Sequence, residues 1–264
     1  MPEQVVDGAA EISDEIAVGR EGQCVTIRIN RTDKRNALTF AMYSAAARAL
    51  EDANADQDVR VVVLTGTGGS FTAGNDLGDF LSGDRTEGTG EQAPVRRFQE
   101  AVLNSRAVLI AAVDGPAVGI GATVLLHCDL VYATRRSYLL FPFIDLGLVP
   151  EFASSLLLPR LIGPARAAEI LLFGERLPAE TANQLGLVTT VLPDADALTE
   201  HVAERVAALL AKPARALAEV RALLRTRGAE ESLARMGLES AAFRAMLRDP
   251  DTKARIAAVL AGRR

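Results

Sequence analysis

Residues 114–129 (DGPAVGIGATVLLHCD) constrain the fold of this 264-residue chain more than any other stretch. The apolar run at 108–113 predicts a buried strand, which the DGP sequence at 114–116 ends. Gly119 and Gly121 follow, and we expect a helix to begin near Gly121. Glycines at such a turn let the backbone approach a ligand, and the free N–H groups of a first helical turn favour negative charge. The stretch predicts either an oxyanion-binding turn or a turn whose glycines only let the helix pack on the sheet.

A second turn of the same kind lies earlier in the chain. Residues 61–66 (VVVLTG) predict another buried strand, and a glycine-rich turn at 67–70 leads into residues 71–77 (FTAGNDL). Asp76 is placed to act as the N-cap of the helix that follows. Two such turns can each direct a backbone N–H at one oxygen atom, which favours the oxyanion interpretation.

Both stretches resemble segments of the crotonase (enoyl-CoA hydratase/isomerase) superfamily. Residues 71–76 are similar to its Phe-x-Ala-Gly-x-Asp segment, and residues 115–121 to its Gly-x-Ala-x-Gly-x-Gly segment. The resemblance runs in order from about residue 14 to about residue 247. Three further segments take part in it: 30–38 (NRTDKRNAL), 158–163 (LPRLIG) and 179–188 (AETANQLGLV).

Alternating strand and helix patterns predict an α/β fold with parallel pairing. The resemblance implies the family's ββα spiral, with residues 1–193 forming an acyl-CoA-binding core. Residues 194–264 read as amphipathic helices broken near Pro213, Gly228 and Pro250. In the family such helices cover the site and build trimers, so we expect a homotrimer or a hexamer made of two trimers.

Glu151 is the candidate catalytic residue. Taken alone, it fits an acid in a first helical turn, where it would complement the helix dipole. The resemblance instead puts the catalytic carboxylate of enoyl-CoA isomerases at this position. Set among Val149, Phe152 and Leu156, the carboxylate should be poorly solvated and more basic than usual. Such a base suits removal of a proton beside a thioester carbonyl.

The resemblance also assigns the other site residues. It gives the oxyanion donors as the backbone N–H groups of Asn75 and Ile120. The loop at residues 31–35 can be a solvated charged turn, but in the family it borders the CoA nucleotide. The remaining candidates are Ala73, Gly74, Asp76, Gly119 and Gly121 for the supporting turns, Lys34, Arg35 and Ala37 for CoA, and Phe80, Leu81, Phe143 and Leu148 for the acyl pocket.

Hydratases of the family use two glutamates to activate water. Aligned through Gly119 and Gly121, the first position is Thr123, and aligned through residues 146–147, the second is Phe143. Neither can act as a base, and Phe143 would dry the site. Asp145 lies nearby in sequence, and we expect it to be an acceptor within its own loop rather than a group that supports the site.

Composition excludes other classes of function. A net charge of −5 gives no reason to expect nucleic acid or an anionic membrane as partner. Two histidines without a ligand-spaced cluster predict no metal site. No apolar run reaches about eighteen residues, and five acids among the first twenty residues match neither a signal nor a transit peptide. We therefore expect a cytoplasmic location.

The sequence thus predicts an enzyme of fatty-acid metabolism that isomerises 3-enoyl-CoA to trans-2-enoyl-CoA. No cofactor is expected, because the thioester itself stabilises the anion. Two alternatives stay open: an enoyl-CoA hydratase with an atypical site, and a catalytically silent oligomer that binds CoA thioesters.

Overall fold

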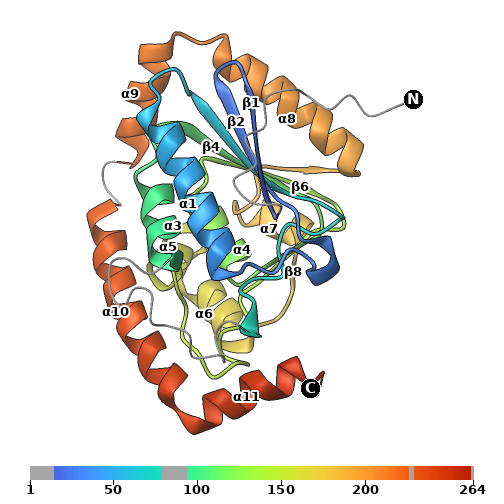
Figure 1. The fold of residues 1–264 in the computed structure, drawn as a ribbon, viewed down its shortest axis with the longest axis vertical. Helices are drawn as coiled ribbons and strands as arrows, with labels where there is room; N and C mark the ends of the chain where they lie inside the picture. Colours follow the sequence, from blue (N-terminus) through green and yellow to red (C-terminus); the bar gives the residue numbers. More distant parts are fainter. Residues whose placement is uncertain (1–14, 79–93, 226–228, 263–264) are drawn as a thin grey trace.

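The structure, a computed structural model, describes residues 15–78, 94–225 and 229–262. Its centre is a six-stranded sheet in which an antiparallel hairpin leads into parallel strands (Figure 1). The predicted hairpin and the strands predicted at 61–66 and 108–113 are confirmed. In spatial order the strands are β1 (Ile16–Glu21), β2 (Cys24–Ile29), β3 (Val61–Gly66), β4 (Val108–Val113), β6 (Leu130–Thr134) and β9 (Thr190–Leu192).

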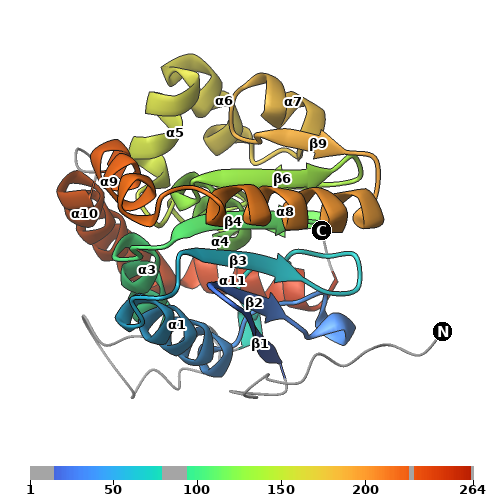
Figure 2. The same ribbon diagram turned by 90° about the horizontal axis from the view of Figure 1, so that it is seen from above.

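Both faces of this sheet are buried. Side chains of β4 alternate between two hydrophobic clusters, with Leu109, Ala111 and Val113 in one and Val108, Ile110 and Ala112 in the other. Helices α1 (Phe40–Ala55) and α3 (Pro94–Leu103) contribute to the first cluster. Helix α8 (Ala195–Leu210) contributes to the second and runs alongside β4 and β6 in Figure 2. Burial on both faces explains why the central strands are continuous apolar runs in the sequence.

The described residues also form a second, smaller sheet. It contains β5 (Pro116–Val118), β7 (Tyr138–Leu140) and β8 (Leu177–Pro178). Strand β4 leads into β5, and β6 leads into β7, so each turn of the chain places one strand in each sheet. The segment after β3 joins this layer through an isolated parallel bridge between Thr72 and Ala117. The chain therefore winds as a spiral of strand–strand–helix turns.

Helices of different lengths connect the strands of the spiral. Thr39 caps α1 as its hydroxyl accepts from the Met42 N–H at 3.2 Å. The helix expected near Gly121 begins one residue earlier. The remaining helices of the core are η1 (Thr32–Lys34), α4 (Ile120–Thr123), η2 (Val124–His127), α5 (Ser154–Ile162), α6 (Pro164–Phe173) and α7 (Ala179–Gln184).

The C-terminal region is helical, as predicted: α8 is followed by α9 (Ala214–Arg225), α10 (Ala229–Arg248) and α11 (Pro250–Leu260). Helix α9 is attached to the core by Arg221 and Arg225, which pair with Asp129 at 2.7 and 3.0 Å. Helix α11 is attached by the Thr252 hydroxyl, which donates to the Gly147 carbonyl at 3.0 Å. The domain boundary predicted at residue 193 stays a prediction. Helix α8 lies beyond it, yet packs on the sheet of the core.

Within the described residues, no helix has both the length and the apolar character needed to cross a bilayer. The cytoplasmic location stays a prediction.

Candidate active site

The two glycine-rich turns lie against each other at the carboxyl ends of β3 and β4. Gly74 and Gly119 both have positive φ, at 92° and 57°. A Cβ on Gly74 would lie 3.0 Å from the carbonyl oxygen of Val118, and one on Gly119 would lie 3.9 Å from the Cα of Gly74. A side chain at Gly74 would therefore separate the turns. This close approach brings Asn75 and Ile120 to the same part of the molecule.

Hydrogen bonding leaves the N–H groups of these two residues available. Asn75 forms a parallel bridge with Leu38, whose N–H and carbonyl bond to Gly74 and Asp76 at 2.8 and 2.9 Å. In such a bridge the N–H of the opposite residue points away from its partner. Ile120 is the first residue of α4, where an N–H has no intrahelical acceptor. Within the described residues neither N–H donates to a protein acceptor.

Asn36, which the sequence analysis did not single out, fixes the first turn. It is fully buried with φ 61°. Its amide donates to the carbonyls of Thr67 and Ser70 at 2.9 and 2.6 Å, while its side-chain oxygen accepts from the Arg31 N–H at 2.8 Å. Its own carbonyl accepts from the Thr72 hydroxyl at 2.6 Å. These bonds join the 31–36 loop to the strand-to-helix turn that carries Asn75.

Two other residues assigned to the supporting turns, Ala73 and Asp76, form hydrogen bonds that hold the first turn. Ala73 donates its N–H to the Arg35 carbonyl at 2.9 Å. Asp76 caps a helical turn by accepting from the Gly78 N–H at 2.9 Å, as predicted, and also pairs with Arg31 at 2.6 Å. The Arg31 guanidinium contributes to holding the pKa of Asp76 below its usual value despite partial burial.

Gly121 is packed too tightly for a side chain. A Cβ there would lie 2.4 Å from the Cγ2 of Thr72. Thr72 in turn accepts from the Gly74 N–H at 3.0 Å, so the second glycine turn is in contact with the first.

The CoA candidates lie in the loop beside the first turn. Lys34 and Arg35 are exposed, and no ion pair involves either of them in the described part of the chain. Ala37 is half-buried, and its carbonyl accepts from Arg31 at 3.0 Å. The two cationic side chains are therefore free to contact an anionic group.

Glu151 is a buried carboxylate that lies before α5 rather than in its first turn. The side chain is 9% exposed, and among the described residues its Oε1 atom has no hydrogen-bond partner. Burial, and then the negative charge of Glu239, raises the pKa of Glu151 to about 8. The first-turn interpretation is wrong because the helix starts only at Ser154, after Phe152 and Ala153 with positive φ.

Tyr43 of α1 lies between the Glu151 carboxylate and the glycine turn that carries Asn75. Its hydroxyl donates to the side-chain oxygen of Asn75. Burial and the nearby charge of Glu151 raise the pKa of Tyr43 well above its usual value. Tyr43 therefore lies close to both Asn75 and Glu151, and one region holds a basic carboxylate and two free N–H donors.

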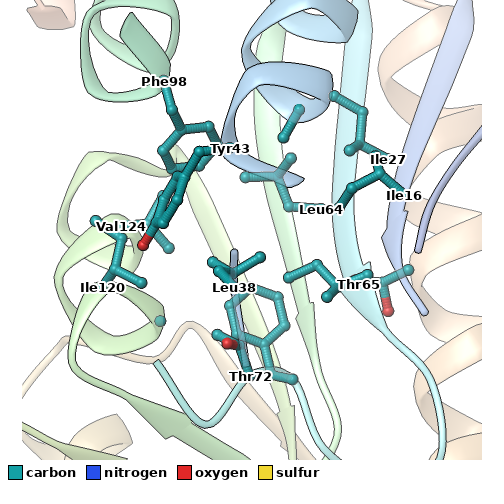
Figure 3. Close-up of a pocket in the computed structure, with 14 residues that line it drawn as sticks. Ile16, Ile27, Leu38, Tyr43, Leu64, Thr65, Thr72, Phe98, Ile120 and Val124 are labelled. Atoms are coloured by element: carbon teal, nitrogen blue, oxygen red, sulfur yellow. The ribbon is translucent and has the colours of Figure 1, made fainter. Parts of the chain in front are cut away.

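An apolar pocket adjoins this region, between the first sheet and helices α1, α3 and α4 (Figure 3). Tyr43 and Ile120 both line it, and Figure 3 shows the Tyr43 hydroxyl directed toward the α4 side. The site is therefore apolar on this side. The other lining residues are Ile16, Ile27, Ile29, Leu38, Ala46, Leu64, Thr65, Phe71, Thr72, Phe98, Gly121 and Val124.

The two positions expected to replace hydratase glutamates are buried. Thr123 is fully buried, and its hydroxyl donates to the Ile120 carbonyl at 3.3 Å. Phe143 is buried in the hydrophobic core. Asp145 is exposed, and no hydrogen bond to its carboxylate is found in the described residues.

Of the other acyl-pocket candidates, Leu148 is buried in the same core cluster as Phe143. Phe80 and Leu81 lie outside the described residues. Neither Phe143 nor Leu148 lines the pocket of Figure 3, so these two belong to a different wall of the region or to the core alone.

Comparison with known proteins assigns the family. A family model described as enoyl-CoA hydratase/isomerase matches residues 19–260. The chain belongs to the enoyl-CoA hydratase/isomerase family. The family acts on acyl-CoA thioesters, and the spiral described above is its crotonase fold, as predicted.

Individual relatives point to the same family. Enoyl-CoA delta isomerase 2 of Rattus norvegicus is 43% identical over 197 residues, which are 74% of this chain and 50% of the rat protein. Enoyl-CoA delta isomerase 3, peroxisomal, of Mus musculus is 38% identical over 74% of this chain and 62% of its own length. This chain thus spans about half to two thirds of these relatives. The structure of Pseudomonas aeruginosa OdaA matches with a TM-score of 0.90 and 43% identity, covering 94% of this chain and 99% of that one.

The sequence did not identify three residues that hold the candidate site together, which are Asn36, Tyr43 and Glu239. Asn36 lies inside a motif used for the resemblance, but nothing in the motif marked its side chain as the link between two loops. Tyr43 lies on the apolar face of a predicted helix and reads as core. Glu239 contacts the Glu151 loop from 86 residues away, a distance over which no local pattern carries a signal.

Proposed function

We propose that this protein isomerises 3-enoyl-CoA to trans-2-enoyl-CoA. The observation that carries the proposal is the buried carboxylate of Glu151, which has a pKa raised to about 8 and, within the described residues, one oxygen atom without a hydrogen-bond partner. The positions that resemble the glutamates of hydratases hold Thr123 and Phe143. Such a site supports moving one proton more readily than activating a water.

The proposed reaction needs one base and one oxyanion site. The Glu151 carboxylate removes a proton from C2 of the substrate, and the electron pair moves into the thioester to give a dienolate. The N–H groups of Asn75 and Ile120 donate to the dienolate oxygen. Donors held in place before the reaction need no reorganisation when the charge develops. Glu151 then returns the proton at C4, which restores the carboxylate and leaves the double bond between C2 and C3.

Substrate binding is proposed on the same basis. Lys34 and Arg35 contact the phosphates of CoA, and Ala37 borders its nucleotide. The acyl chain lies against apolar side chains, with Phe143 and Leu148 as candidates. No cofactor is required in this scheme, because the thioester carbonyl holds the negative charge of the intermediate.

We further propose that the C-terminal helices, beginning with residue 194, build a trimer or a pair of trimers. Large apolar side chains are exposed on α9, where Leu223 and Leu224 are 76% and 80% exposed, and on α10, where Leu238 is 68% exposed. Exposed apolar patches of this kind mark interaction surfaces.

The test is Glu151→Gln, which keeps the shape of the side chain and removes the base. Turnover of 3-enoyl-CoA should fall by about 10²- to 10⁴-fold, while the affinity for a saturated acyl-CoA changes little. For the wild type, kcat/KM should rise with pH until about 8, because the base must be ionised. If the wild-type protein binds acyl-CoA but turns over no thioester, the result would favour the catalytically silent binder.

A further inference from the structure

A second buried carboxylate contacts the loop that carries Glu151. Glu239, on α10, is 6% exposed. Its Oε2 atom accepts from the Ala153 N–H at 2.6 Å, and its Oε1 atom accepts from the Ser155 N–H at 3.0 Å and the Ser155 hydroxyl at 2.5 Å. All three donors belong to the start of α5. Glu239 therefore occupies the N-terminal end of a helix that has no side-chain cap of its own.

The backbone that Glu239 holds is strained. Phe152 and Ala153 both have φ 56°, in the left-handed region that side chains disfavour. Non-glycine residues stay there only when their surroundings hold them, and such strain is typical of functional sites. Both residues lie between Glu151 and the helix, so the path of this backbone sets where the Glu151 side chain begins.

His127 of η2 holds the same strained segment from the other side. Its ring stacks on Phe152 with the ring centroids 3.9 Å apart, and its Nε2 lies 2.8 Å from the Phe152 carbonyl oxygen. Because that oxygen can only accept, Nε2 carries the proton. Burial lowers the pKa of His127 to about 4, so the ring is neutral. Through η2 the segment is connected to α4 and to the Ile120 N–H.

We propose that Glu239 is a positioning residue for Glu151: by accepting from Ala153 and Ser155 it fixes the left-handed backbone that directs the Glu151 carboxylate at the substrate. This proposal rests on the proposed function of Glu151 as the base. Both oxygens of Glu239 are engaged by donors at the start of α5, so its contacts are with the backbone that carries Glu151.

The negative charge of Glu239 also affects the titration of Glu151. The groups that face Glu151 are Glu239 from α10 and Tyr43 from α1, and Glu239 is also near Arg235 on its own helix. After burial, the negative charge of Glu239 is the second cause of the raised pKa of Glu151. Removing that charge should therefore lower the pKa of Glu151, while burial keeps it above 4.5.

Glu239→Gln is the direct test, because glutamine keeps the volume, loses the charge and presents an N–H₂ group to one of the backbone donors. We expect kcat to fall by on the order of tenfold to a hundredfold with KM nearly unchanged. The titration of the Glu151 carboxyl, followed by ¹³C NMR, should shift to lower pH. The matched control is Glu231→Gln: Glu231 also joins α10 to α5, through Arg160, but at an exposed position. It should leave both kcat and the titration unchanged.

A Glu239→Gln protein that keeps wild-type kcat and an unshifted Glu151 titration would overturn the proposal. If Glu239→Gln does not fold, Ser155→Ala decides: it removes one donor and leaves the charge, so kcat should fall while the Glu151 titration stays near that of the wild type. An unchanged kcat in Ser155→Ala would then overturn the proposal. The NMR titration does not depend on turnover. A wild type without isomerase activity refutes the proposed function, whereas a shifted titration in Glu239→Gln still supports the contact.

Discussion

The stability that Glu151→Gln gains over the wild type should increase as the pH rises from 5 to 8. The pKa of the folded carboxyl is about 8, against 4.5 when it is exposed. Below pH 4.5 the group is protonated in both states and costs nothing. Between 4.5 and 8 the unfolded carboxyl ionises while the folded one keeps its proton, so stability falls with rising pH. Above 8 both are ionised, and the loss is constant.

The size of the effect follows from these two pKa values. Each pKa unit corresponds to about 1.4 kcal/mol, so the wild type loses about 1 kcal/mol by pH 5, about 3 kcal/mol by pH 7 and about 4 kcal/mol by pH 8. Glutamine has the same shape and does not titrate. The free energy of unfolding of Glu151→Gln should therefore exceed that of the wild type by amounts that grow in this order.

Urea unfolding at pH 5, 7 and 8, at one protein concentration, measures these differences. Glu231→Gln is the control of opposite sign, because the Arg160 guanidinium lowers the pKa of Glu231 and its loss should not stabilise the protein at any pH. A difference between Glu151→Gln and wild type that stays flat from pH 5 to pH 8 would show that the buried carboxyl titrates near its ordinary value, and the reasoning would fail.

Two further substitutions test the oxyanion turns. Gly121→Val forces a side chain against Thr72, which should cost about 1–3 kcal/mol of stability and, by displacing one donor, roughly a hundredfold to a thousandfold in kcat. Its control, Gly237→Ala, adds a Cβ with nothing within 4 Å and should leave kcat unchanged; a folded, fully active Gly121→Val would remove the oxyanion assignment. Tyr43→Phe leaves the Asn75 side-chain oxygen without its donor and should lower the free energy of unfolding by about 1 kcal/mol. Thermal unfolding with turnover assays would check it, and unchanged stability would show that this bond contributes nothing.

The parts of the site that follow strands could be predicted from the sequence. A buried parallel strand is a continuous apolar run, and a glycine-rich turn after it marks a close approach of backbone. The sequence therefore predicted that both turns could direct an N–H group at one oxygen atom, whereas the contact between Gly74 and Gly119 came from the structure. The position of Glu151 came from the resemblance, and its burial could be read from its apolar neighbours.

What the sequence could not predict depends on distant contacts. The helix after Glu151 begins only at Ser154, because Phe152 and Ala153 adopt a left-handed backbone. Nothing in their residue types favours it; His127 and Glu239 hold it from elsewhere in the chain. The side chain of Asn36 acts likewise between two loops. Such residues read as ordinary core or helix positions until their partners are known.

Product analysis on paired thioesters tests the central claim most directly. Purified protein is given a 3-enoyl-CoA and, separately, the 2-enoyl-CoA of the same chain length, and the products are separated by chromatography. If Glu151 is the base and no second group activates water, conversion of 3-enoyl to 2-enoyl-CoA should exceed hydration by on the order of a hundredfold. If 3-hydroxyacyl-CoA is the main initial product from the 3-enoyl-CoA, or if the 2-enoyl-CoA is hydrated as fast as the 3-enoyl-CoA is isomerised, the isomerase assignment is contradicted.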